Sequence, residues 1–261
     1  MTDVSAEHIR EAVRDAYSEI ALANGGGCCG PSAGACCTDG SVSLELGYSR
    51  EDLDAVPAGA DLGLGCGNPG AIAALQPGET VLDLGSGAGF DAFLAARAVG
   101  PTGHVIGVDM TPAMVSKARA NAEAGAYAHV EFRLGKIEHL PVSDSTVDVI
   151  ISNCVINLST DKTAVFREAF RALRPGGRLA ISDVVAFVDL PDEVRGDLAL
   201  YSGCMAGASL MSELTTTITT AGFVDVAIAP KDESRSFIER WAPGRDLAEY
   251  VVSATIAAVK P

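Results

Sequence analysis

The sequence predicts an α/β protein with a Rossmann-like, doubly wound fold, in which helices cover both faces of an open, mostly parallel sheet. Three observations support this prediction. Segments typical of strands and of helices alternate between residues 80 and 185, a pattern that favours βαβ units. A glycine-rich turn joins the first strand of this series to the first helix. An aspartate ends the second strand.

The N-terminal part begins with an amphipathic pattern and then loses it. Apolar residues recur at helical spacing between Ile9 and Ile20, which predicts a helix over residues 6–23. Residues 24–41 are rich in Gly, Cys, Ser and Pro and include CCGPSAGACC, so we expect a loop. The segment GLGCGNPG, residues 63–70, is too rich in glycine for a regular element.

The central and C-terminal parts contain short apolar runs and periodic segments. Strands are predicted at residues 80–84, 104–109, 129–134, 147–152, 178–185, 223–229 and 250–259. Helices are predicted at residues 90–99, 112–124, 161–173 and 210–221. We expect Pro175-Gly176-Gly177 to close the helix that begins at residue 161. The regularity loosens after about residue 188, and no motif explains the segment around Trp241.

Composition limits the function classes. The chain of 261 residues carries a net charge of −15, which disfavours nucleic acids and anionic membranes as partners. The N-terminus has early acids and lacks the apolar stretch of a signal peptide, and no later run is apolar enough to span a bilayer. We therefore expect a cytoplasmic protein, where its seven cysteines act as ligands, redox groups or core residues rather than as structural disulfides.

The glycine-rich turn predicts a nucleoside site. Its sequence is Gly85-Ser86-Gly87-Ala88-Gly89-Phe90, and Phe90 replaces the last glycine of the dinucleotide pattern. Asp109 ends the second predicted strand, where a carboxylate can accept hydrogen bonds from ribose hydroxyls. The alternative is a glycine-rich turn beside a surface acid. The register of strand, turn, helix, strand and acid favours the nucleoside site.

Four segments together resemble the motif series of class I S-adenosylmethionine-dependent methyltransferases: VLDLGSGAGF, GVDM, GKIEHLP and LRPGG. The resemblance covers about residues 75–185. It implies cofactor contacts by Asp83, Gly85, Ser86 and Gly87 at the methionine and ribose part, by Asp109 at the ribose, by Met110 on the adenine, by Ile137 and Glu138 at the adenine edge, and by Asn153 near the methyl group.

Three isolated cysteines occupy three predicted loops or strand ends. Cys66 lies between two glycines, Cys154 follows the strand at 147–152, and Cys204 lies among small residues. A buried structural role is the commoner one for a free cysteine, but ligands bind at the carboxyl ends of parallel strands, so the position of Cys154 supports a site role equally well. Three thiolates indicate a thiophilic ligand. The spacings typical of zinc sites are missing from the sequence, whereas pyramidal trivalent arsenic takes three sulfur ligands and keeps a lone pair that a methyl group could accept.

GLGCGNP, SNCVINL and the Cys204 loop resemble arsenite S-adenosylmethionine methyltransferases over about residues 7–220. The resemblance implies that Cys154 and Cys204 bind arsenic throughout the cycle. Cys66 would be a third ligand and a redox partner of Cys37, with Cys36 the other choice. It also implies arsenite and methylarsenite as substrates, S-adenosylmethionine as methyl donor, and a thiol reductant of the thioredoxin or glutathione type.

These assignments divide the chain into three parts. Residues 1–74 would hold the N-terminal helix and the Cys-rich substrate and redox segment, residues 75–187 the S-adenosylmethionine-binding core, and residues 188–261 a smaller arsenic-binding region with closing strands. We expect a monomer, and a role for Cys28 and Cys29 in capturing arsenite. Two alternatives stay open: a class I methyltransferase of another small molecule, and a thiol-rich metalloid-binding protein without turnover.

Overall fold

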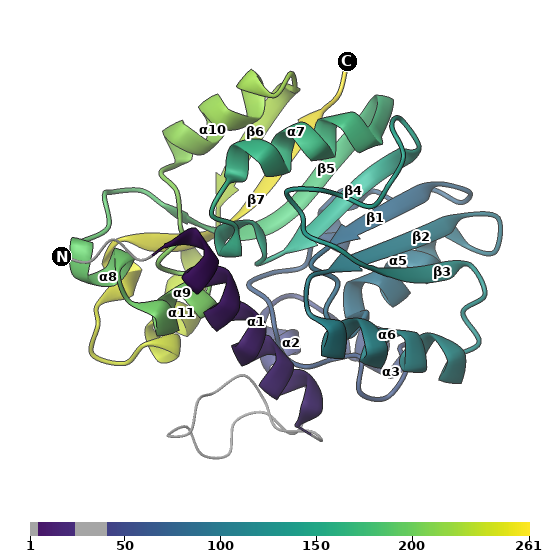
Figure 1. The fold of residues 1–261 in the computed structure, drawn as a ribbon, viewed down its shortest axis with the longest axis horizontal. Coiled ribbons are helices and arrows are strands. Elements are labelled where there is room, and N and C mark those ends of the chain that lie inside the picture. The colour runs from purple at the N-terminus through teal and green to yellow at the C-terminus, as the bar shows by residue number, and fades with distance from the viewer. Residues whose placement is uncertain (1–4, 24–40) are drawn as a thin grey trace.

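A computed structural model describes residues 5–23 and 41–261 of the chain (Figure 1). Its centre is one sheet with the strand order β3-β2-β1-β4-β5-β7-β6. The strands are β1 (Thr80–Leu84), β2 (His104–Asp109), β3 (Val130–Leu134), β4 (Val147–Asn153), β5 (Leu173–Ala186), β6 (Val224–Pro230) and β7 (Val251–Val259). This confirms the α/β class and every strand that the sequence predicts.

Strand direction confirms the mostly parallel sheet. The strands β1 to β5 pair in parallel. β7 inserts antiparallel between β5 and β6. Because β1 lies between β2 and β4, the connections reverse direction at the carboxyl ends of β1 and β4. Ligands of open α/β sheets bind at such a point.

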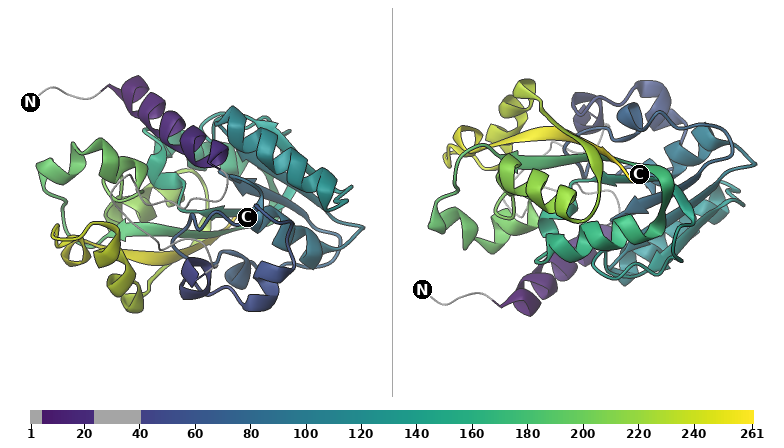
Figure 2. Two further views of the ribbon diagram at one scale, coloured as in Figure 1. Left: turned by 90° about the horizontal axis from the view of Figure 1, so that it is seen from below. Right: turned by 90° about the horizontal axis from the view of Figure 1, so that it is seen from above.

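Helices cover both sides of the sheet, as the two views in Figure 2 show. The longer helices are α1 (Ala6–Leu22), α5 (Phe90–Val99), α6 (Pro112–Ala124), α7 (Lys162–Ala172) and α10 (Met211–Thr220). The shorter ones are α2 (Ser41–Glu45), α3 (Arg50–Asp54), α4 (Gly70–Ala73), α8 (Asp192–Arg195), α9 (Leu198–Ser202) and α11 (Arg235–Trp241), with the 3₁₀ turns η1 (Ile156–Leu158), η2 (Asp232–Ser234) and η3 (Leu247–Glu249).

Successive side chains along each strand point to opposite faces of the sheet, so one part of the core lies on each face. On one face Leu82, Ile150 and their neighbours pack against α7 and α10 around Phe166. On the other face Val81 and its neighbours pack against α5 and α6 around Phe93. Near-continuous apolar strands are what a parallel sheet buried on both faces requires. A third cluster joins the loops at the carboxyl ends of the strands to α1, α8, α9 and α11, which gather at one side of the molecule in Figure 1.

One boundary differs from the prediction. The helix ends at Ala172, and β5 begins at once at Leu173 and runs through Pro175-Gly176-Gly177. Leu173 pairs with Val147, and the register shifts before the next pair, so these residues form an irregularity inside the strand rather than a helix cap. Gly176 has a φ of 79° and its N–H donates to the Lys260 carbonyl at 2.8 Å, which turns the chain without ending the strand.

The loosely patterned C-terminal region supplies short helices around the third cluster. Trp241, which no motif explained, ends α11 and packs against Phe237, with ring centroids 5.0 Å apart. Among the described residues, no helix is long and apolar enough to cross a membrane.

Candidate active site

The glycine-rich turn takes a backbone shape that glycine favours. Gly85, Gly87 and Gly89 have φ values of 68°, 51° and 99°. A Cβ at Gly85 would lie 2.4 Å from Val155 Cγ2, and one at Gly89 would lie 2.6 Å from the ring of Phe93. The open side is at Gly87, where a Cβ would meet no heavy atom of the described residues within 4 Å. The turn therefore packs tightly against the protein on one side and leaves room for a ligand on the other.

Three buried polar side chains surround this turn. Asp109 Oδ2 accepts the Gly87 N–H at 3.0 Å and its Oδ1 accepts the Thr111 N–H at 2.8 Å. Among the described residues, Asp83 Oδ2 and Ser86 Oγ are buried without a hydrogen-bond partner. A buried polar group without a partner costs free energy, so both atoms are suited to a ligand with hydrogen-bond donors.

Asp83 is a buried acid with a second acid nearby. Burial, followed by the charge of Asp91, raises the pKa of Asp83 well above the ordinary value. A positive group bound beside the carboxylate would lower the pKa again. The donors and the positive charge of S-adenosylmethionine fit these residues.

The positions expected at the adenine lie along β2 and the segment after β3. Met110 lines a cavity of about 210 Å³ together with Gly135, Lys136 and residues of α1. Ile137 is buried in the core, and Glu138 accepts a hydrogen bond from Ser159 Oγ at 2.6 Å. The structure thus places Met110 at this cavity, whereas Ile137 and Glu138 are not among the residues that line it.

Asn153 lies at the end of β4 in a network that the sequence did not reveal. Its Nδ2 donates to Tyr48 Oη at 2.9 Å and to Asp91 Oδ2 at 3.1 Å, and Tyr48 Oη donates to Asp91 Oδ1 at 2.5 Å. Burial raises the pKa of Asp91 to about 6. Asp91 directly follows the glycine-rich turn and Phe90, and this position was the one signal that could have pointed to it.

Three cysteines from separate loops meet beside this network. Cys66 lies between α3 and α4, Cys154 follows β4, and Cys204 lies between α9 and α10. All three are buried and unbridged. The sulfurs of Cys66 and Cys154 lie within 4.8 Å of each other, and Cys204 Sγ donates to the Cys154 carbonyl at 2.5 Å. The structure therefore brings together three residues that are far apart in the sequence.

Two further side chains touch this cluster and were missed from the sequence. A carboxylate oxygen of Asp183 and the sulfurs of Cys66 and Cys154 all lie within 4.8 Å of one another. Tyr17 of α1 donates its hydroxyl to the Ser202 carbonyl at 3.4 Å and packs against the apolar cluster that contains Cys204. Asp183 lies near the carboxyl end of β5, and Tyr17 lies on the amphipathic helix, so their positions alone offered a weak signal.

The surroundings of Cys66 and Cys154 raise the pKa values of both thiols. Hydrogen bonds with Cys204 and then Cys66 raise the pKa of Cys154 well above its ordinary value. Burial raises the pKa of Cys66, and the nearby Asp183 charge adds to the effect. A protonated cluster of soft donors can bind a thiophilic ion when its protons leave with the groups that the ion gives up.

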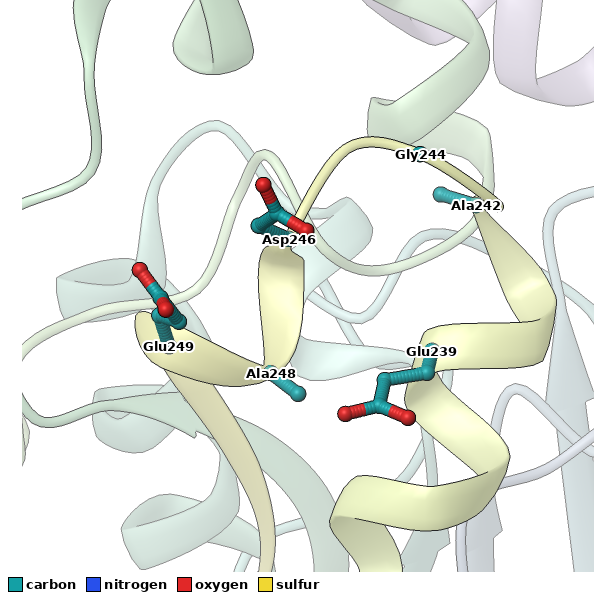
Figure 3. A pocket seen from close by; sticks show the side chains of 6 residues that line it. All are labelled: Glu239, Ala242, Gly244, Asp246, Ala248 and Glu249. Atoms are coloured by element: carbon teal, nitrogen blue, oxygen red, sulfur yellow. The ribbon is translucent and has the colours of Figure 1, made fainter.

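Other parts of the chain do not join this site in the described structure. Cys28, Cys29, Cys36 and Cys37, including the predicted redox residue, lie outside the described residues. A cavity of about 260 Å³ between α11 and η3 is lined by Glu239, Ala242, Gly244, Asp246, Ala248 and Glu249 (Figure 3). It contains none of the predicted site residues.

An open parallel sheet, a glycine-rich turn with unpartnered polar atoms and an acid at the end of β2 define a class I methyltransferase that uses S-adenosylmethionine. A family model described as a methyltransferase domain matches residues 75–222, more than half of the chain.

Similar proteins of known family show to which group of methyltransferases the chain is related. An arsenite methyltransferase of Halobacterium salinarum is 56% identical over 100% of this chain and 69% of its own length. One of Aquipseudomonas alcaligenes is 46% identical over 62% of this chain, but the match spans only 48% of that protein. The crystal structure of an arsenic(III) S-adenosylmethionine methyltransferase from Chlamydomonas reinhardtii superposes with a TM-score of 0.65 at 34% identity, covering 85% of this chain and 73% of that one. The chain belongs to the arsenite methyltransferase family.

Proposed function

We propose that this methyltransferase binds trivalent arsenic through Cys66, Cys154 and Cys204 and methylates it with S-adenosylmethionine. One observation supports this most directly: three buried, unbridged thiols from three loops meet at the carboxyl ends of the strands, beside the glycine-rich turn. The names of the relatives agree with this chemistry.

Binding replaces oxygen by sulfur on arsenic. Each thiol forms an As–S bond, and its proton leaves with one hydroxide of arsenous acid as water. Three thiols thus release three waters and no net proton. The raised pKa values of Cys66 and Cys154 are compatible with this exchange, because no free thiolate has to accumulate in the buried cluster.

Alignment is the main contribution of the chain to the transfer. S-adenosylmethionine supplies an activated methyl group, which the arsenic lone pair takes as the carbon–sulfonium bond breaks and leaves its electron pair on sulfur. Cys154 lies next to Val155, whose side chain packs at the Cα of Gly85 in the glycine-rich turn. This contact sets the arsenic ligand against the cofactor turn, and such positioning accounts for much of the rate of a two-substrate reaction. The transfer itself needs no general base.

A redox step completes the cycle. Transfer leaves arsenic formally pentavalent, and two electrons return it to the trivalent state. We assign these electrons to Cys37, or Cys36, and Cys66, which become a disulfide that an external dithiol of the thioredoxin or glutathione class then reduces. Methylarsenite then re-enters as substrate, and the chain acts as a monomer.

The deciding experiment follows the methyl group. The full chain is incubated with arsenite, methyl-labelled S-adenosylmethionine and a dithiol, and the arsenic species are separated. We expect label in methylated arsenic and an equal amount of S-adenosylhomocysteine. Arsenic binding without S-adenosylhomocysteine release would instead indicate a metalloid-binding protein. Label on a substrate other than arsenic would indicate another class I methyltransferase.

A further inference from the structure

The chain flanks Cys154 with two asparagines that contact different loops. Asn153 is the last residue of β4, and Asn157 lies in η1. Each makes at least one hydrogen bond to the main chain of another cysteine loop, and its remaining hydrogen bonds go to other segments. None of these hydrogen bonds involves a sulfur atom.

Asn153 holds the Cys66 loop on both sides of the cysteine. Its Oδ1 accepts the Cys66 N–H at 3.1 Å, and its Nδ2 donates to the Gly67 carbonyl at 2.8 Å. A Cβ at Gly65 would lie 2.8 Å from Asn153 Nδ2. The loop is therefore pressed against this side chain, and its glycines permit the close approach.

Asn157 does the same for the Cys204 loop. This buried side chain donates through Nδ2 to the Val184 carbonyl at 2.6 Å, to Asp183 Oδ1 at 2.9 Å and to the Cys204 carbonyl at 3.2 Å. A Cβ at Gly207 would lie 2.0 Å from the Asn157 carbonyl oxygen, so the loop rests directly on this residue.

Backbone strain shows why such bracing is needed. Cys154 and Cys204 have φ values of 57° and 63°, a left-handed conformation that is strained for a residue with a side chain. Strained residues of this kind persist where their surroundings over-determine them. Asp183 contributes by accepting the Ile156 N–H at 2.9 Å, which fixes the turn directly after Cys154.

We propose that Asn153 and Asn157 are positioning residues for the three-thiol site, with Asn153 setting the place of Cys66 and Asn157 that of Cys204 relative to Cys154. This rests on the proposed function. It implies that the loss of each side chain affects the binding of a different set of substrates. Arsenite exchanges three hydroxyls for thiols, whereas methylarsenite exchanges two and needs only Cys154 and Cys204. Loss of Asn153 therefore affects arsenite, and loss of Asn157 affects both substrates.

The test reads thiol protection rather than turnover. The reduced full chain and its Asn153→Ala and Asn157→Ala variants are loaded with arsenite or with methylarsenite and alkylated, and each cysteine is located by mass spectrometry. Wild type should protect Cys66, Cys154 and Cys204 with arsenite. Asn153→Ala should leave Cys66 open and lose about tenfold in arsenite affinity, the value of one lost hydrogen bond, with methylarsenite affinity within about threefold of wild type. Asn157→Ala should leave Cys204 open and lose about tenfold for both.

A matched control separates positioning from general damage. Asn121 of α6 is also buried and donates through Nδ2 to the Ala88 carbonyl at 3.0 Å, and among the described residues it makes no side-chain hydrogen bond to the Cys66 or Cys204 loop. Asn121→Ala should keep the wild-type protection pattern. If the Asn157→Ala variant fails to fold, the Asn157→Ser variant, which retains one donor, is used instead. The same pattern of cysteine protection is expected for it.

The outcomes distinguish this inference from the proposed function. A wild-type chain that binds no arsenic contradicts both. A wild-type chain that binds arsenic, with variants that protect the same three thiols or with an Asn153→Ala variant that loses arsenite and methylarsenite equally, overturns the roles of Asn153 and Asn157 alone.

Discussion

The glycine-rich turn and the cysteine cluster meet at the same edge of the sheet but reach left-handed backbone in opposite ways. The turn uses glycines at 85, 87 and 89, which adopt this conformation without strain. The cluster uses Cys154 and Cys204, which do not. The shape of the turn is thus encoded locally. The shape of the cluster depends on hydrogen bonds that Asn157 donates and Asp183 accepts across several elements.

The largest effect is expected from a substitution that removes one sulfur atom and leaves the glycine-rich turn intact. Cys154→Ser should lower arsenic methylation by more than about a thousandfold, because serine oxygen does not replace a thiophilic ligand. Affinity for S-adenosylmethionine, measured by calorimetry, should stay within about threefold of wild type. The Cys37→Ser variant is the comparison: it should complete the first methylation and slow later rounds. A Cys154→Ser enzyme with wild-type turnover would refute the ligand assignment.

The second effect compares two glycines of the turn. Gly85→Ala places a methyl group against Val155 and should lower the free energy of unfolding by about 3 kcal/mol or more. Gly87→Ala meets open space and should cost only the left-handed backbone energy, about 1 kcal/mol. Urea unfolding measures both. If both variants lost the same free energy of unfolding, the contact between the glycine-rich turn and Val155 beside the cluster would contribute nothing to stability.

A smaller effect tests the strain at Cys154. The Cys154→Gly variant should be at least as stable as Cys154→Ala, because glycine relieves the left-handed conformation and offsets the lost methyl group. Ala180 in β5, equally buried but in a regular strand, is the control, and Ala180→Gly should lose about 1–2 kcal/mol. If glycine costs as much at residue 154 as at residue 180, the strain argument is wrong.

The smallest effect is a pH shift. Because the pKa values of Cys154 and Cys66 are raised, their thiolates form only at higher pH than that of an exposed cysteine. The midpoint of the alkylation rate against pH should therefore lie above that of peptides with the same local sequences. Mass spectrometry of the alkylated peptides gives the two midpoints, and values at or below those of the peptides would contradict the raised pKa.

The same contrast explains what the sequence could predict. The strands, the long helices and the glycine-rich turn follow from periodicity and from local residue preference, and the structure confirms them. The irregular start of β5 was missed because its cause, pairing of Leu173 with Val147, is not local. The assignment of Cys66, Cys154 and Cys204 as ligands stays a prediction that came from a resemblance.

Residues that act through the tertiary structure were beyond local reasoning. Local sequence gives little sign of a role for Tyr48, Asp91 or Asp183. Their role becomes visible only in the folded chain, where they lie beside Asn153 or the thiols. Asn157 stood inside the quoted motif SNCVINL, yet its three acceptors lie on other segments. A polar residue beside a candidate ligand signals a role, but its partner is visible only once the chain is folded.

The antiparallel strand β7 has a consequence for the newly made protein. Ser253 of β7 donates its hydroxyl to the Cys66 carbonyl at 2.6 Å, across 187 residues of sequence. A ribosome therefore has to synthesise the chain past residue 253 before this bond can fix the Cys66 loop. Until β7 joins the sheet, the Cys66 loop lacks this hydrogen bond and the three cysteines are not yet held together. The thiols of the newly made chain are therefore most exposed to a thiophilic poison before β7 is in place.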